Sequence, residues 1–201
     1  MSDRPVLVAV AGGSGSGKST LVSELCDRLD DRVSLILMDD YYHDRTDISK
    51  AERERIDYDS IDSLDIPHLM YQLHDLRQGV PVEGPQYDFD SHTRKSATRT
   101  IRPANWILID GILVLAHHEL REFFDIKIFV DAPESIRLRR RLERDVRDRG
   151  RTEESVRRQW AETVKPNHER LVEPSKMYAD YVVNGAERQS WETVMQLLNR
   201  E

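Results

Sequence analysis

Near its start the chain reads Gly12-Gly13-Ser14-Gly15-Ser16-Gly17-Lys18-Ser19-Thr20, which matches the phosphate-binding pattern G-x-x-x-x-G-K-[ST]. An apolar run, Val6–Ala11, precedes it and a helix-period segment, Ser19–Leu29, follows it, so the pattern has the strand–loop–helix setting it requires. Glycines let successive backbone N–H groups curl around phosphates, and the helix N-terminus adds positive potential. We therefore expect residues 12–20 to bind ATP, with Lys18 on the β- and γ-phosphates and Ser19 on Mg²⁺.

Such a P-loop does not by itself separate a kinase from a GTPase, an ATPase motor or a nucleotide sensor. The chain contains no Asn-Lys-x-Asp guanine-reading motif. The remaining evidence must come from the ends of the other strands.

Short apolar, β-branched runs alternate with helix-period segments along the chain. This rhythm predicts an α/β P-loop kinase fold, a mostly parallel five-stranded sheet flanked by helices. The predicted strands are Val6–Ala11, Val33–Met38, Trp106–Ile109, Ile126–Val130 and Tyr181–Val183. The predicted helices are Ser19–Leu29, Pro67–Arg77, Pro133–Asp148, Glu153–Val172 and Trp191–Leu198.

Residues 79–103 break this rhythm. The segment is rich in Pro, Thr and Ser, with extended character around Val80–Phe89 and Ser96–Arg102, which indicates an inserted β-hairpin. No repeat or linker divides the chain, so we expect one domain over residues 1–201.

Two predicted strands run into aspartates, at Asp39-Asp40 and at Asp110. Ligands of open parallel sheets collect at the carboxyl ends of the strands. Asp39 could take the proton of an acceptor hydroxyl, and Asp110 could hold Mg²⁺ through water, so Ser19, Asp39 and Asp110 are the expected metal-site residues. Taken alone, each aspartate could equally be an ordinary strand-ending turn residue.

The stretch from Arg137 to Arg158 contains ten arginines and five carboxylates. Some of these arginines fit a solvated helix with i,i+4 ion pairs. Others fit a lid over about residues 137–165 that bends at Gly150, because guanidinium groups match the charge that spreads over a transferring phosphoryl group. RNA binding is disfavoured by the overall acidity, a net charge of −7.

Composition limits the other possibilities. The longest apolar run near the N-terminus, Val6–Ala11, is too short for a membrane span, so we expect no membrane partner. The negative net charge likewise argues against a nucleic-acid partner. The single cysteine, Cys26, excludes an internal disulfide and suits the cytoplasm.

Several segments beyond the P-loop resemble the uridine/cytidine kinase family. The resemblance runs over nearly the whole chain and rests on five segments: Met38-Asp39-Asp40-Tyr41-Tyr42, Tyr87-Asp88-Phe89 with Ser91-His92-Thr93-Arg94, Asp110-Gly111-Ile112-Leu113, Arg140-Arg141 with Arg144-Asp145 and Arg149-Gly150-Arg151, and Glu173-Pro174-Ser175-Lys176 with Tyr178-Ala179-Asp180.

The resemblance implies transfer of the ATP γ-phosphoryl group to the 5′-hydroxyl of uridine or cytidine, with GTP as another donor, and a homotetramer. Asp39 would be the base, assisted by Lys18, Arg144 and Arg149 as catalytic residues. The lid residues Arg149 and Arg151 would also contact ATP. The implied nucleoside-binding residues are Asp59 on the ribose hydroxyls, Tyr87 and His92 on the base, and Arg141, Arg144 and Gln159.

The chain departs from the family pattern at three places. Asp110 replaces a glutamate, Asp40 replaces a small residue, and Ser60-Ile61 replaces a His-Pro turn after Asp59. Repulsion between Asp39 and Asp40 is expected to raise the pKa of one of them if both are desolvated. A related kinase for another alcohol, similar to phosphoribulokinase or pantothenate kinase, is the main alternative, and a non-catalytic ATP-binding regulator is the other.

Overall fold

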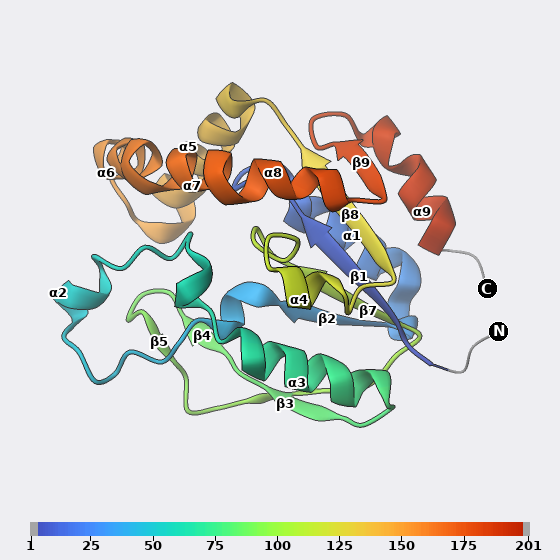
Figure 1. Ribbon diagram of the computed structural model, residues 1–201. Helices are drawn as coiled ribbons and strands as arrows, with labels where there is room; N and C mark the ends of the chain where they lie inside the picture. Colours follow the sequence, from blue (N-terminus) through green and yellow to red (C-terminus); the bar gives the residue numbers. More distant parts are fainter. Residues whose placement is uncertain (1–3, 199–201) are drawn as a thin grey trace.

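The computed structural model describes residues 4–198 and has a five-stranded parallel sheet at its centre (Figure 1). The strand order is β2-β7-β1-β8-β9, and every neighbouring pair is parallel. The strands are β1 Val6–Ala11, β2 Val33–Leu37, β7 Trp106–Asp110, β8 Ile126–Asp131 and β9 Tyr181–Asn184. All five predicted strands are present, and the predicted fold class is confirmed.

Helices cover both faces of the sheet and divide the core in two. Alternate residues of β1 point to opposite faces: Leu7 and Ala9 pack in one core, Val8 and Val10 in the other. The first core includes Leu69 and Leu73 of α3 Ile66–Arg77, and the second includes residues of α1 Lys18–Leu29 and α9 Glu192–Leu198. Strands buried on both faces explain why they read as continuous apolar runs.

The other α-helices lie after the strand ends. They are α2 Lys50–Arg53, α4 His118–Arg121, α5 Glu134–Arg149, α6 Glu153–Gln159, α7 Lys165–Asn167 and α8 Glu173–Ser175. Helix α5 ends at Gly150, whose φ of 61° is the left-handed conformation that favours glycine at a helix end. The bend expected at Gly150 is therefore present.

The predicted helix Glu153–Val172 continues beyond Val172 to Ser175 and contains two π-helical segments. These are Trp160–Val164 and His168–Val172, with α7 between them and α8 after them. Pro166 and Pro174 each follow a π-helical segment. A proline lacks the N–H and crowds the carbonyl four residues earlier, and the wider π-turn accommodates both effects without ending the helix.

The insert at residues 79–103 forms two short antiparallel ladders instead of one continuous hairpin. Strand β3 Val82–Gly84 pairs with β6 Arg99–Ile101, and β4 Tyr87–Asp88 pairs with β5 Thr93–Arg94. Pro85 lies between β3 and β4, where it cannot donate a ladder hydrogen bond. The insert lies beside α3 in the view of Figure 1.

Over residues 4–198, the structure has no helix that is both long enough and apolar enough to cross a membrane.

Candidate active site

The P-loop connects β1 to α1 in a conformation that requires its glycines. Gly12 and Gly15 have φ of 139° and 78°, and a Cβ on either would overlap a backbone carbonyl, of Val130 and Arg137 respectively. Lys18, at the first position of α1, is only 8% exposed. The loop is therefore a preformed cradle of backbone N–H groups with one lysine beside it.

Arginines at the start of α5 support this cradle from below. Arg140 donates from Nη1 to the carbonyl oxygens of Ser16 and Gly185, both at 3.1 Å. Arg137 is 5% exposed and donates from Nε to the carbonyl oxygen of Ala132 at 3.1 Å. Arg140 therefore supports the P-loop through hydrogen bonds, and Arg137 packs against Gly13 and Gly15 while its Nε holds the residue after β8. Both lie inside the expected lid region.

The expected magnesium ligands Ser19 and Asp110 lie together. The Ser19 hydroxyl donates to Asp110 Oδ2 at 2.9 Å, and Asp110, at the end of β7, is 9% exposed. Residues 4–198 contain no group of three or more His, Cys, Asp or Glu side chains that could hold a metal ion. A hydroxyl and a carboxylate, completed by phosphate and water oxygens, fit Mg²⁺, which keeps several waters in such sites.

Asp39 follows β2, in the 3₁₀ turn Met38–Tyr41, and faces the same region. Burial and, next, the negative charge of Asp110 together raise the pKa of Asp39 to about 6, while the charge of Lys18 opposes both effects. Asp59 and Arg149 also act on this carboxyl. The site therefore brings together the proposed base, the P-loop lysine and residues from the nucleoside loop and the lid.

Asp40 does not raise the pKa of its neighbour Asp39 by repulsion, as its position in the sequence suggested. Its Oδ1 accepts a hydrogen bond from the backbone N–H of Tyr87 at 3.1 Å, so it anchors the insert. Burial raises the pKa of Asp40, and burial and Asp110, not Asp40, raise that of Asp39. The expected repulsion between the adjacent carboxylates is thus not the cause of either shift.

Asp59, the predicted ribose residue, lies in the loop before α3. Burial raises its pKa, and the Arg141 guanidinium opposes that shift. Lys18 and Arg144 also lower it. Asp59 therefore lies within electrostatic range of both the P-loop and the arginine-rich segment.

The insert contributes an aromatic cluster. Tyr87 is 4% exposed, and its ring meets that of Tyr42 edge-on at 5.2 Å between centroids. His92 has a φ of 55° and stacks on Tyr58, with ring centroids 5.0 Å apart and planes at 17°. Burial lowers the pKa of His92, which leaves a neutral imidazole with one donor and one acceptor. Tyr58 was not predicted as a site residue, although its place before Asp59 was a signal.

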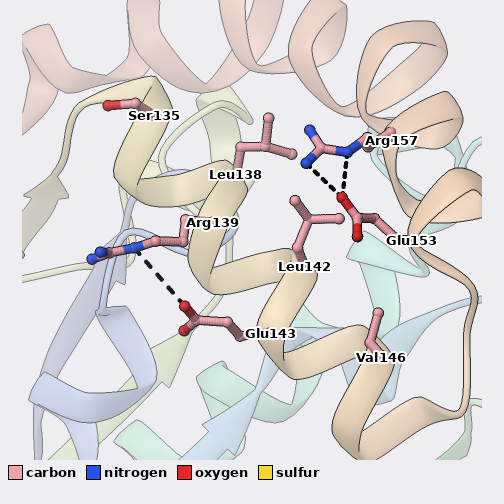
Figure 2. Close-up of a pocket in the computed structure, with 8 residues that line it drawn as sticks. All are labelled: Ser135, Leu138, Arg139, Leu142, Glu143, Val146, Glu153 and Arg157. Atoms are coloured by element: carbon pink, nitrogen blue, oxygen red, sulfur yellow. Dashed lines mark hydrogen bonds and ion pairs between the residues drawn. The ribbon is translucent and has the colours of Figure 1, made fainter.

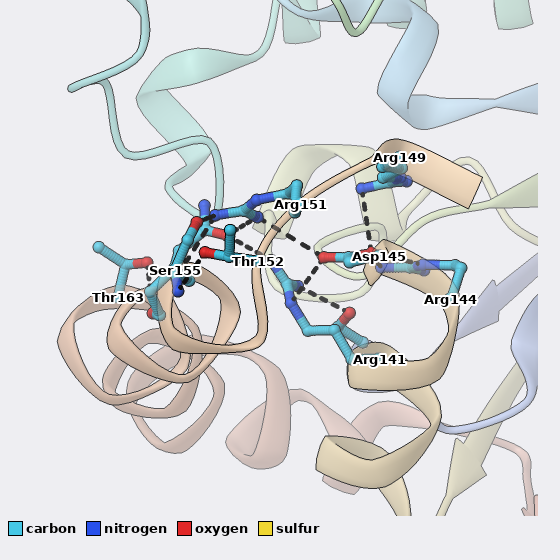
Figure 3. A network of polar contacts seen from close by, with 10 residues as sticks. Arg141, Arg144, Asp145, Arg149, Arg151, Thr152, Ser155 and Thr163 are labelled. Atoms are coloured by element: carbon cyan, nitrogen blue, oxygen red, sulfur yellow. Dashed lines mark hydrogen bonds and ion pairs between the residues drawn. The ribbon is translucent and has the colours of Figure 1, made fainter. Parts of the chain in front are cut away.

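Four arginines of the expected lid region converge on one buried carboxylate, Asp145 (Figure 3). Arg144 donates from Nε to Asp145 Oδ1 at 2.9 Å, and Asp145 is fully buried. Arg141, Arg149 and Arg151 lie 3.5–3.6 Å from its oxygens. The sequence predicted the arginines but gave Asp145 no role.

Arg141 joins this cluster to the P-loop. Its Nη1 donates to the Ser14 hydroxyl at 2.9 Å and its Nη2 donates to Gln159 Oε1 at 2.8 Å. Gln159 Oε1 also accepts from Arg151 Nη1. The predicted residues Arg141, Arg151 and Gln159 therefore form one network with the phosphate cradle.

A pocket of about 360 Å³ adjoins the P-loop on the side of β9. Its lining includes Gly17, Thr20 and Arg140, together with residues that follow β9: Gly185, Ala186, Arg188 and Trp191. Sequence reasoning missed this pocket, although the turn after β9 stands at the carboxyl end of a parallel strand.

A larger groove, of about 500 Å³, lies along the outer face of α5 (Figure 2). Leu138, Leu142 and Val146 form its apolar stripe, and the ion pairs Arg139–Glu143 and Arg157–Glu153 lie at its sides. None of the predicted site residues lines it.

The sequence matches the Phosphoribulokinase / Uridine kinase family over residues 7–191. It is 46% identical to a uridine kinase of Lactobacillus johnsonii over 184 residues, covering 90% of this chain and 87% of the relative. It is 42% identical to a uridine kinase of Clostridium tetani, covering 91% and 88%.

Solved structures with the same fold include two kinases for other acceptors. Phosphoribulokinase from Rhodobacter spheroides has a TM-score of 0.67 at 16% identity, covering 92% of this chain and 74% of that one. D-glycerate 3-kinase from Cryptococcus neoformans has a TM-score of 0.66 at 16% identity, covering 86% and 80%. At this identity the likeness establishes the fold alone.

Proposed function

The chain belongs to the phosphoribulokinase/uridine kinase family, and we propose that it transfers the γ-phosphoryl group of ATP to the 5′-hydroxyl of uridine or cytidine, giving UMP or CMP. The observation that carries this proposal is that three charged groups lie close together. Lys18 and Asp59 both act electrostatically on Asp39, and Lys18 also acts on Asp59. A base, a phosphate-binding lysine and a second half-buried carboxylate would then serve one reaction centre, with an aromatic insert beside it.

The P-loop would bind the triphosphate of ATP through its backbone N–H groups and Lys18. Ser19 and Asp110 would hold Mg²⁺, whose charge would neutralise that of the phosphate oxygens. The adenine would lie in the pocket after β9, against Arg140 and Trp191. GTP would be accepted as a second donor.

Asp39 would act as the base. With a pKa of about 6, it is mostly ionised at neutral pH and still basic enough to accept the 5′-hydroxyl proton. The 5′-oxygen forms a bond to the γ-phosphorus as the bond to the β–γ bridging oxygen breaks, and ADP leaves. Lys18, Arg144 and Arg149 would stabilise the charge on the transferring group.

The acceptor site would select a ribonucleoside. Asp59 can accept hydrogen bonds from both vicinal ribose hydroxyls, so a 2′-deoxyribose would leave a buried acceptor unpaired. The neutral His92 can both donate and accept at the pyrimidine edge, and Tyr87 offers a ring to the base. Arg141 and Gln159 would border the nucleoside.

A sugar-phosphate acceptor, as in the phosphoribulokinase-like alternative, would need basic side chains where Tyr58, Tyr87 and His92 cluster. A non-catalytic ATP-binding regulator would have no use for Asp39. Both alternatives are therefore less well supported.

The test is ADP release with Mg·ATP against uridine, cytidine, deoxycytidine, adenosine, pantothenate and ribulose 5-phosphate. We expect turnover with uridine and cytidine, reduced at least about 10³-fold in Asp39→Asn. ATP binding without pyrimidine-dependent ADP release would refute the acceptor assignment. A cytoplasmic location and a homotetramer are part of this proposal, and sedimentation analysis tests the tetramer.

A further inference from the structure

Asn167 uses both ends of its side-chain amide in partly buried hydrogen bonds. It is 5% exposed and is the last residue of α7, between the two π-helical segments. Its Nδ2 donates to Asp57 Oδ2 at 2.6 Å, and its Oδ1 accepts from Arg170 Nη2 at 2.7 Å. A residue of α7 thereby holds a loop that lies 110 positions earlier in the chain.

Asp57 passes this contact on to the loop that carries Asp59. Its Oδ1 accepts the backbone N–H of Asp59 at 3.0 Å, and its carbonyl oxygen accepts the Ser63 hydroxyl at 2.6 Å. Asp57 therefore fixes the backbone at Asp59, and Asn167 fixes the carboxylate of Asp57. Each oxygen of that carboxylate has one defined donor.

The direction of the Asp59 side chain depends on this backbone. A carboxylate that must accept from two hydroxyls at once tolerates little rotation, because a hydrogen bond weakens steeply when its donor–H···acceptor angle falls below about 120°. Small misplacements at such a residue lower the rate by large factors.

We propose that Asn167 is a positioning residue for the acceptor site, which holds Asp59 in place for the ribose hydroxyls through its hydrogen bond to Asp57. The inference rests on the proposed function, because it takes the acceptor to be a ribonucleoside. Asn167 touches neither substrate; it acts through Asp57.

The pair permits an exchange experiment. Asn167→Asp alone would place a carboxylate against that of Asp57, where the wild type has a hydrogen bond of 2.6 Å. Asp57→Asn alone would face two amides. In the double variant Asp57→Asn/Asn167→Asp, the new amide donates to the new carboxylate, which still accepts from Arg170, and the amide oxygen still accepts the Asp59 N–H.

The measurements are kcat and KM for uridine and 2′-deoxyuridine with Mg·ATP, in the wild type, both single variants and the exchanged pair. We expect Asn167→Asp to lower the ratio of kcat/KM for uridine over 2′-deoxyuridine about tenfold, and the exchanged pair to return it to within about threefold of the wild type. Asp62→Asn, which removes an exposed charge from the same segment, should leave the ratio unchanged.

A loss that is equal for both nucleosides, or one that the exchanged pair does not reverse, would overturn the inference, because a purely structural defect affects both acceptors alike. A wild type that turns over neither pyrimidine ribonucleoside would instead refute the proposed function. The hydrogen-exchange rate of the Asp59 amide then still decides the inference. It should rise in Asn167→Asp and return in the exchanged pair, and an unchanged rate would contradict the role of Asn167.

Discussion

Asp39 combines a raised pKa with a place at the proposed reaction centre. Burial is the main cause of the shift and Asp110 the next, while Lys18 lowers the pKa. A carboxyl group in this state loses its proton only near neutral pH, which makes it a better base than an exposed aspartate. If Asp39 is the base, as proposed, the same residue affects both the pH dependence of the reaction and the stability of the fold.

The pKa of Asp39 should respond to Asp110. We expect a value of about 6 in the free protein and a lower one in Asp110→Asn, because that substitution removes the neighbouring negative charge. Carbon-13 NMR titration of the aspartate carboxyls measures it. The control is Asp148→Asn, which removes an exposed charge from α5. An Asp39 pKa that does not move in Asp110→Asn would contradict this account.

Asp39 should also lower stability at neutral pH. Its pKa in the folded protein lies above the ordinary aspartate value of 3.8, so the folded state binds the extra proton and stability falls as pH rises from about 4 to above 6. Asp39→Asn should therefore raise the free energy of unfolding at pH 7.5 by about 1–2 kcal/mol, allowing for partial solvation, and by much less at pH 4. Urea unfolding at both pH values measures the difference, and an equal gain at both would argue against the titration of Asp39.

At the scale of an element, α5 carries most of the arginine chemistry. Its first turns contact the P-loop, Arg137 by packing against Gly13 and Arg140 by hydrogen bonds, and its last turns gather arginines around Asp145. The guanidinium groups near Asp145 outnumber its single charge, which leaves a cluster ready for phosphate oxygens.

Asp145→Asn should destabilise the protein by about 3 kcal/mol, because removing one partner leaves buried charges uncompensated. Tripolyphosphate should restore part of this loss, since its oxygens replace the missing anion. Thermal unfolding with and without tripolyphosphate tests both statements.

The matched control on the same helix is Asp148→Asn, which breaks an exposed ion pair with Arg147. It should change stability by less than about 0.5 kcal/mol. Equal losses of stability in the two variants would show that a buried partner of the arginines contributes no more to stability than an exposed one.

The elements that the sequence predicted well are those with a strong local signal. The P-loop and the five apolar runs led to the observed strands within one residue at each end. The π-helical segments could not be predicted, because Pro166 and Pro174 normally indicate helix ends and only tertiary packing keeps the helix going. The break in the insert at Pro85 was open to prediction, since proline interrupts a ladder.

At the scale of the site, sequence pattern indicated residue types better than partners. Asp39, Asp110 and the arginines of residues 137–165 could be proposed as site residues from motif and strand position. The hydrogen bond from Asn167 to Asp57 could not, since it joins two segments that no local pattern relates. Asp40 was misjudged for the same reason, because its partner Tyr87 is distant in sequence.

At the scale of the whole molecule, binding of a nucleotide should increase the free energy of unfolding. A non-hydrolysable Mg·ATP analogue at 100 times its Kd should raise the free energy of unfolding by about 2.7 kcal/mol. Chelating Mg²⁺ should remove most of the gain, and Ser19→Ala should reduce the effect of Mg²⁺, because it deletes a predicted ligand and the hydrogen bond to Asp110. Thermal shift measurements follow all three. A gain that does not depend on Mg²⁺ would contradict the assigned site.

The pairing of Val82 with Ile101 means that the insert leaves the fold and re-enters it at neighbouring points. A segment attached in this way can be exchanged without changing the spacing of the parallel strands on either side. Grafting residues 79–103 from a kinase of the same family with another acceptor is therefore a route to altered substrate choice in which the phosphate-transferring half of the protein stays as it is.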